Sequence, residues 1–233
     1  MKILGIDTST KFCNLGLIED EDVLAEYTIN GLKKKHSSIL VPAIKDLLKT
    51  MDLKMEEING IAVSIGPGSF TGLRIGLGVA KGLSYACSLP LLGIPTLEAV
   101  AFPLRGIPHL ICPILESKKD EIYDVVFQGG ENLYKVMDYK CEDIHSLLTR
   151  LSLLTEKIIF LGDGIRKYRE NIEVKIGENA LFIDSQINLS IATNIAFLGL
   201  GKLKRKEEDD IFILSPFYLR RSEAEIVWEK KYK

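Results

Sequence analysis

The sequence predicts an α/β protein made of two similar lobes, each with a mixed β-sheet. In each half of the chain, three segments with strand character come before the first helix. A helical segment, a short apolar strand and a second helical segment then follow in the same order in both halves. Doubly wound nucleotide-binding folds alternate strands and helices, so an initial meander of three strands is not typical of them. We therefore expect a duplicated fold whose unit reads strand-strand-strand-helix-strand-helix.

Composition places the chain among globular proteins with one large or two small domains. Its 233 residues are 46% apolar and 27% charged, and the net charge of −2 predicts no strong field for nucleic acid. The four cysteines are widely spaced in apolar stretches, which is typical of reduced core residues in a cytoplasmic protein. The start of the chain leads directly into a strand, so we expect no signal peptide. No apolar run of transmembrane length and no basic amphipathic segment is found, so we expect no membrane anchor.

Hydrophobic patterning gives the elements of the first half in order. An acidic turn at 19–22 separates the second strand from the third, and apolar residues at helical spacing follow. The predicted elements are strands over 1–7, 12–18 and 23–29, a helix over 37–51, a strand over 61–65, a helix up to Cys87 and a strand over 91–94. These elements fill a predicted first lobe over residues 1–100.

The second half repeats this order. Its predicted elements are strands over 109–115, 121–127 and 132–137, a helix over 142–154, a strand over 158–161, a helix opening over 165–171 and a further helix from 189 to about 206. The aromatic and basic tail is expected to dock on the fold through Phe217, Tyr218 and Trp228. The predicted second lobe covers residues 101–233, and its last helix and tail are candidates to cross back to the first lobe.

Two turns lie where this order of elements predicts a cleft between the lobes. A lobe that starts with three strands fits the ribonuclease-H-like unit shared by actin, sugar kinases and Hsp70, whose first hairpin turn and later glycine turns face the cleft. Asp7, Thr8 and Ser9 form the first turn. Gly66 and Gly68 lie between a strand and a helix, which suits either a tight turn or an anion at the helix N-terminus.

The helix after the second turn is rich in glycine. Gly72 and Gly76 form one pair with small-residue spacing, and Gly78 and Gly82 form another. Each glycine inside a helix costs up to about 1 kcal/mol relative to alanine. Close approach of another backbone would explain them. That backbone belongs either to the chain's own sheet or to a helix of a partner.

Four segments carry a resemblance to a known family. They read LGIDTST at 4–10, HSSILVPAIKDLL at 36–48, SIGPGSFTGLRIGLGVAKGLSYACSLPLLGIPTLEA at 64–99, and PFYLRRSEAE at 216–225. Together they resemble the bacterial TsaB family of tRNA threonylcarbamoyladenosine biosynthesis proteins. The resemblance is strong over about the first 100 residues and at the tail, with GPGSFTGLRIG its most specific part.

The resemblance implies an actin-like fold with two lobes and a role in tRNA modification. Proteins of this family are regarded as noncatalytic partners of the related TsaD, together with the ATPase TsaE. TsaD transfers a threonylcarbamoyl group from its adenylate to the adenosine next to the tRNA anticodon. The resemblance thus implies a cytoplasmic subunit without a cofactor of its own, with tRNA as the substrate of the complex. A homodimer of the free chain is left open.

One segment departs from the catalytic relative. TsaD carries a VNHLEGH-type segment whose two histidines hold a metal, whereas this chain reads IPTLEAV at 94–100. Thr96 and Val100 stand at the histidine positions. Valine has no donor atom and a threonine hydroxyl is a poor ligand compared with imidazole. We therefore expect no metal site of that kind and no catalytic residues.

The resemblance also implies that the first two helices pair with TsaD or with a second copy of the chain. The residues predicted to contact the partner are Ile39, Ala43, Gly72, Arg74 and Gly76. An exposed face of small and apolar residues requires a partner. The alternative is that these residues pack on the chain's own sheet. If they face a partner, Gly76→Leu should abolish pairing and leave the fold intact.

Two other functions are weighed against this one. The first is an active actin-like enzyme, a phosphotransferase or glycoprotease that depends on a nucleotide or a metal, with Asp7 as its carboxylate. The second is direct tRNA binding, which would rest on the basic clusters Lys33-Lys34-Lys35, Arg220-Arg221 and Lys230-Lys231. Clusters of this size are also common on solvated surfaces.

Overall fold

The computed structural model describes residues 1–30, 36–118, 120–183, 191–221 and 228. Its strands are β1 (Lys2–Asp7), β2 (Phe12–Glu19), β3 (Asp22–Asn30), β4 (Gly60–Gly66), β5 (Leu91–Pro95), β6 (Leu110–Glu116), β7 (Glu121–Gln128), β8 (Tyr134–Asp143), β9 (Ile158–Leu161) and β10 (Ala180–Phe182). Its α-helices are α1 (His36–Thr50), α2 (Phe70–Cys87), α3 (Thr96–Ala101), α4 (Ile144–Leu151), α5 (Ile165–Ile176) and α6 (Ile191–Lys204). Short 3-10 turns cover Met55–Glu57, Phe102–Leu104 and Gly177–Asn179.

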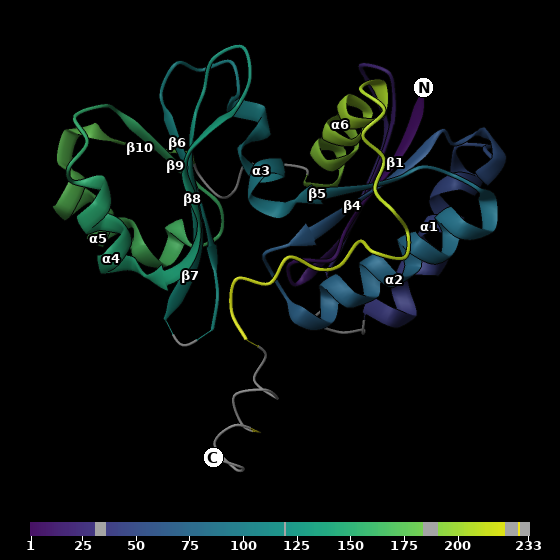
Figure 1. The fold of residues 1–233 in the computed structure, drawn as a ribbon, viewed down its shortest axis with the longest axis horizontal. Helices are drawn as coiled ribbons and strands as arrows, with labels where there is room; N and C mark the ends of the chain where they lie inside the picture. The colour runs from purple at the N-terminus through teal and green to yellow at the C-terminus, as the bar shows by residue number, and fades with distance from the viewer. Residues whose placement is uncertain (31–35, 119, 184–190, 222–227, 229–233) are drawn as a thin grey trace.

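The strands form two mixed sheets with the same topology, one in each lobe (Figure 1). The first sheet has the order β3-β2-β1-β4-β5, and the second has the order β10-β9-β6-β7-β8. In both, an antiparallel meander of three strands is extended by two strands that run parallel to its first strand. The predicted duplicated, ribonuclease-H-like fold is confirmed.

The two lobes exchange their last helices. The helix α3 leaves the first sheet, lies between the lobes and contacts β6 and β7, while α6 leaves the second lobe and packs on β1, β2 and β4 (Figure 1). The amide of Asn194 in α6 donates to the carbonyl oxygen of Ala99 in α3 at 3.0 Å. The last helix of each half is therefore buried against the other half, which holds the lobes together.

Glycines in the first sheet permit the close approach of α6. A Cβ added at Gly5 or Gly16 would lie well inside 3.0 Å of the α6 backbone, at Ala192 and Thr193. Real Cβ atoms do not approach so closely, so these strand positions accept only glycine unless the helix moves. The apolar layer between α6 and the sheet includes the buried side chains of Ile3 and Ile195.

Most predicted elements are confirmed, with differences where local signals are weak. Each lobe has one strand and one helix more than the predicted unit. Of these four elements, β5 and α6 match predicted segments, whereas β10 and α3 were not predicted. The strand β10 has only 3 residues, all half-buried, and α3 has 6 residues and no side-chain N-cap. The predicted helix over 142–154 begins later, because the carboxylate of Asp143 caps α4 by accepting from the backbone N–H groups of His145 and Ser146.

In the part of the chain that the structure describes, no helix has the length and apolar character needed to cross a lipid bilayer. The helix α2 is the longest, with 18 residues. It carries the charged residues Arg74 and Lys81, and its exposed residues besides Arg74 are Thr71, Gly78, Gly82, Tyr85 and Ala86.

Candidate functional site

The β1–β2 turn holds its aspartate by hydrogen bonds within the chain. Asp7 is fully buried at the end of β1. Its Oδ1 accepts from the backbone N–H of Ser9 at 2.9 Å, and its Oδ2 accepts from Nδ2 of Asn14 at 3.0 Å. Asn14 lies directly opposite Asp7 in the antiparallel register, so the sheet itself places this partner. Both carboxylate oxygens therefore serve the local fold.

Thr8 joins this turn to the glycine-rich helix. Its hydroxyl donates to the carbonyl oxygen of Gly72 at 2.7 Å. A Cβ added at Gly72 would overlap the Thr8 carbonyl oxygen, and one added at Gly76 would overlap the Thr8 hydroxyl. The pair Gly72 and Gly76 thus lets α2 lie directly against the β1–β2 turn.

Ser9 closes the start of α2. The backbone N–H of Ser69 donates to the Ser9 carbonyl oxygen at 2.7 Å, and the Ser69 hydroxyl caps the helix by accepting from the N–H of Gly72. Gly68, with φ of +159°, faces Ser9 so closely that a Cβ there would be 2.8 Å from the Ser9 Cβ. The predicted cleft residues Asp7, Thr8, Ser9 and Gly68 therefore lie in one packed cluster.

Gly66 belongs to a different contact. It has φ of +119°, a conformation that favours glycine, and a Cβ there would lie 2.6 Å from the carbonyl oxygen of Phe217. The backbone of the tail therefore runs directly over the end of β4. The sequence does not reveal this approach, because Gly66 and Phe217 are far apart in the chain.

Four of the five residues predicted to contact a partner are buried within the chain, contrary to the expectation that they form an exposed face. Ile39 and Ala43 are buried in the core between α1, α2 and the first sheet. Gly72 and Gly76 are buried against Thr8. Periodicity did not reveal this, because glycine has no side chain to indicate its side of the helix. Gly76→Leu should consequently disturb the fold itself, because the added side chain would meet Thr8.

The exposed side of the first two helices carries other residues. Arg74 is exposed, and its Nε donates to the Tyr218 hydroxyl at 2.9 Å. No described atom lies within 4 Å of a Cβ added at Gly78 or Gly82. Tyr85 of α2 is 68% exposed and Val41 of α1 is 52% exposed. The second glycine pair, unlike the first, faces away from the described fold.

The segment that departs from the metal-binding pattern is built into the core. The Thr96 hydroxyl lies 2.8 Å from the Ser64 hydroxyl, and the side chain of Val100 is buried among apolar residues of the second lobe. Among the residues that the structure describes, no group of three or more His, Cys, Asp and Glu side chains could hold a metal ion. Sequence reasoning missed the Ser64 contact, because it joins β4 to α3 across the end of β5.

The second lobe has a carboxylate in the turn that corresponds to the Gly66 turn of the first lobe, because β9 takes the place of β4 in the second sheet. Asp163, in the glycine turn after β9, accepts through Oδ1 from the backbone N–H of Glu116 at 2.8 Å. Burial raises the pKa of Asp163 above its ordinary value. The carboxylate therefore joins the end of β6 to the turn after β9.

The basic clusters are only partly described. Lys33-Lys34-Lys35 and Lys230-Lys231 lie outside the described residues. Within the tail, Nε of Arg220 donates to the Tyr123 hydroxyl at 3.1 Å, and its guanidinium lies 5.7 Å from the centre of the Phe70 ring. Arg220 therefore has a role in packing the tail.

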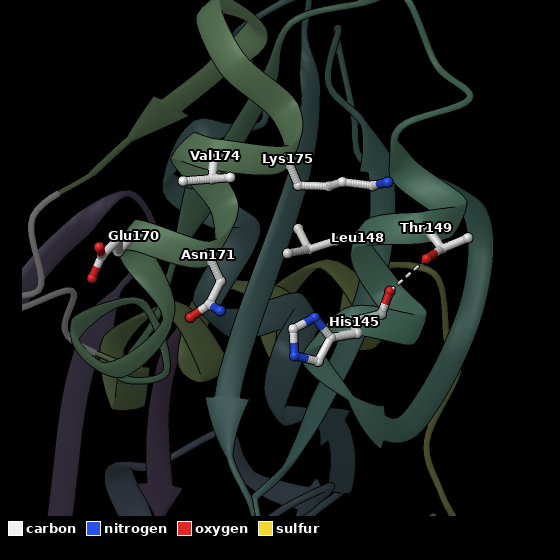
Figure 2. Close-up of a pocket in the computed structure, with 7 residues that line it drawn as sticks. All are labelled: His145, Leu148, Thr149, Glu170, Asn171, Val174 and Lys175. Atoms are coloured by element: carbon white, nitrogen blue, oxygen red, sulfur yellow. Dashed lines mark hydrogen bonds between the residues drawn. The ribbon is translucent and has the colours of Figure 1, made fainter.

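A surface groove of about 520 Å³ lies between α4 and α5 on the second lobe (Figure 2). Its lining residues are His145, Leu148, Thr149, Glu170, Asn171, Val174 and Lys175. Figure 2 shows Lys175 reaching from α5 toward α4. The Thr149 hydroxyl donates to the His145 carbonyl oxygen of its own helix. The groove lies where α4 and α5 pack side by side in the second lobe, and none of its lining residues belongs to the Asp7 turn.

A stability measurement can test the local role of Asp7. Asp7→Ala is expected to lower the free energy of unfolding by roughly 1 to 2 kcal/mol, because it leaves the buried donors of Ser9 and Asn14 without acceptors. Asp7→Asn keeps an acceptor and should lose less. Urea unfolding of both variants measures the difference, and an Asp7→Ala protein as stable as the parent would contradict this role.

Comparison with known proteins gives close sequence relatives. A family model described as TsaD, tRNA N6-adenosine threonylcarbamoyltransferase, matches residues 22–228. The tRNA threonylcarbamoyladenosine biosynthesis protein TsaB of Bacillus subtilis (strain 168) is 33% identical over 237 residues, and the alignment covers 100% of both chains.

Solved structures extend the likeness of fold. A Pseudomonas aeruginosa protein described as similar to peptidase YeaZ matches with a TM-score of 0.79 and 22% identity, covering 94% of this chain and 99% of that one. The ROK hexokinase of Thermus thermophilus matches with a TM-score of 0.57 and 12% identity, covering 88% of this chain and 100% of that one. At these identities the likeness concerns fold alone, and it agrees with the predicted actin-like architecture.

Proposed function

The chain belongs to the TsaB family of tRNA threonylcarbamoyladenosine biosynthesis proteins, and on this premise we propose that it is a noncatalytic subunit that pairs with TsaD. The proposal rests chiefly on one observation, namely that residues 96 and 100 are Thr96 and Val100. These residues stand where the resemblance places the metal-binding histidines of the transferase. The Thr96 hydroxyl forms a hydrogen bond with the Ser64 hydroxyl, and the apolar side chain of Val100 is buried, so neither side chain is available to bind a metal.

The state of Asp7 supports the same proposal. A catalytic carboxylate must reach a substrate, a metal-bound water or a magnesium ion. Asp7 is fully buried, and its two oxygens accept hydrogen bonds from Ser9 and Asn14. The alternative of an active enzyme that depends on a nucleotide or a metal is not favoured by the family to which the chain belongs.

The exposed side of α1 and α2 is the surface we propose for pairing. We call it the helix-pair surface, and it consists of Val41, Arg74, Gly78, Gly82 and Tyr85. The two glycines should each destabilise the helix by up to about 1 kcal/mol, and no described atom of this chain is close enough to explain them. A partner helix that approaches the backbone of α2 would explain both, and Val41 and Tyr85 would add apolar area.

The proposal also covers the wider assembly. TsaE would act on the pair that the chain forms with TsaD, and tRNA would be the substrate of that complex, in the cytoplasm. The same helix-pair surface could join two copies of the free chain. A homodimer of this kind would compete with TsaD, because one surface cannot hold two partners.

Pairing can be tested with one variant and a matched control. Gly78→Arg is expected to weaken binding to TsaD at least about tenfold, because a long charged side chain would prevent close helix contact. Its unfolding midpoint should stay near that of the parent, since the position is open. Gly106→Arg places the same side chain at another open, exposed glycine and should bind normally. Binding by Gly78→Arg at parent affinity would contradict the helix-pair surface.

Catalysis can be tested by reconstitution. Unmodified tRNA would be incubated with TsaD, TsaE, ATP and the threonylcarbamoyl adenylate system, with and without this chain. We expect modification that depends on the chain, and none when TsaD is left out. Modification by the chain without TsaD would contradict the noncatalytic role.

A further inference from the structure

The segment after α6 runs over the first lobe before it turns to the second. In Figure 1 it is the yellow coil segment that leaves α6 and passes across the first sheet and α2. The N–H of Asp209 donates to the Leu91 carbonyl oxygen at 2.9 Å, and Oδ2 of Asp209 accepts from the N–H of Gly93 at 2.8 Å. Leu214 then packs against the core of the first lobe. The segment is therefore fixed to β5 up to this point.

The next residues contact both lobes at once. The N–H of Phe217 donates to the carbonyl oxygen of Ile65 in β4 at 2.7 Å. The ring of the same residue meets Tyr139 of β8 edge to face, with ring centres 5.3 Å apart. Phe217 thus binds the first lobe through its backbone and the second lobe through its side chain.

Tyr218 and Arg220 continue the crossing. The Tyr218 ring stacks on Phe70 of α2 with centres 4.2 Å apart and planes 9° from parallel, and its hydroxyl accepts from Arg74. Arg220 donates to the Tyr123 hydroxyl of β7 in the second lobe. Leu219, between them, packs against the core of the second lobe. Residues 217–220 therefore contact both lobes: Tyr218 binds the first lobe, Leu219 packs on the second, and Phe217 and Arg220 touch both.

We infer that residues 216–220 form an interlobe strap that holds the two lobes in one relative orientation. Lobes of multidomain folds commonly close and open about hinges, and a bound ligand often fixes the closed state. Here the chain's own tail adds contacts that span the lobes to those already made by the exchanged helices α3 and α6. The strap also ends on Phe70 and Arg74, so it connects the start of α2 to the second lobe.

The strap can be tested on the full chain alone, without TsaD, so the result does not depend on the proposed pairing. Nitroxide labels would be attached through ketone-bearing amino acids at Lys45 in α1 and Val174 in α5, both exposed and in different lobes. This chemistry leaves the native cysteines unlabelled. Pulsed electron spin resonance then gives the distribution of distances between the lobes.

The parent should give one narrow distribution. The variant Phe217→Ala/Tyr218→Ala/Arg220→Gln should broaden it by at least about 1.5-fold, because the lobes gain hinge freedom. The control Phe212→Ala/Ile213→Ala alters two exposed residues of the same tail upstream of the strap and should match the parent. A triple variant with the parent's mean and width would overturn the inference.

If the triple variant does not fold, a milder variant tests whether the strap holds the lobes. Tyr123→Phe/Tyr218→Phe removes the two hydroxyls that accept from Arg220 and Arg74 and keeps the packed rings. We expect a distribution broader than that of the control. A distribution equal to the control's would show that these contacts do not hold the lobes, and would overturn the inference in the same way.

Discussion

Gly72→Ala is expected to lower the free energy of unfolding by about 3 kcal/mol, at the upper end of the range for overpacked sites. The added Cβ would lie well inside 3.0 Å of the Thr8 carbonyl oxygen, which is a backbone atom. A side chain could rotate away, but a backbone oxygen moves only with its peptide unit. The change would therefore shift the β1–β2 turn or α2, and with it the hydrogen bond between the Thr8 hydroxyl and Gly72.

The same substitution on the other side of α2 provides the control. Gly78→Ala meets no described atom within 4 Å, so it should stabilise the isolated chain by up to about 1 kcal/mol through helix propensity. Urea unfolding of both variants and the parent measures the two effects. A loss of stability in Gly72→Ala together with a gain in Gly78→Ala would support the conclusion that Gly72 packs against the chain's own fold and that Gly78 lies on an open surface. A loss of stability in both variants would contradict that division.

The second large effect is a loss of stability as the pH rises, and it comes from a buried charge cluster in the second lobe. Asp124 of β7 is fully buried beneath α4. Arg150 of α4 donates to Oδ1 of Asp124 at 2.9 Å and also to Glu142 of β8. Among the described residues, Oδ2 of Asp124 has no hydrogen-bond partner. Two carboxylates thus share one guanidinium, and the buried thiol of Cys112 lies near them.

These surroundings favour the neutral form of Asp124. Burial, followed by the charge of Glu142, raises its pKa to about 7, although Arg150 acts in the opposite direction. The unfolded chain ionises this group at an ordinary pKa near 3.8. The folded state therefore binds the proton more tightly, and folding loses stability as the pH rises from the unfolded pKa to the folded one.

Between pH 5 and pH 8 the expected loss is about 3 kcal/mol, since most of the folded-state titration falls in that interval. Asp124→Asn carries no charge and should remove most of this slope, so that the variant is more stable than the parent at pH 8. Asp138→Asn is the control, because its exposed carboxylate has a lowered pKa and stays ionised over the interval. Urea unfolding at pH 5, 6.5 and 8 measures the slope, and equal slopes in parent and Asp124→Asn would refute the prediction.

The sequence by itself determined the order of elements and the family. Three strands before the first helix, in both halves, sufficed to predict two mixed sheets of the same topology, because alternating or periodic apolar residues report which local structure can bury one face. The segments around Asp7 and Gly66 also identified the TsaB resemblance. Short elements such as β10 and α3 were not predicted, because a few residues carry too little periodic signal.

Only the tertiary structure decided which backbone each glycine faces. The sequence predicted that α2 needs a close neighbour, but a residue without a side chain gives no hydrophobic pattern to show its side. The fold assigns Gly72 and Gly76 to Thr8 and leaves Gly78 and Gly82 open.

The exchange of α3 and α6, and the path of the tail over Gly66, also depend on long-range packing. The contacting residues are far apart in the chain, and each lies in a segment whose own pattern fits several positions in the fold. A local sequence pattern indicates that one face of a helix or strand must be buried. Which other element covers that face is decided only when the whole chain packs.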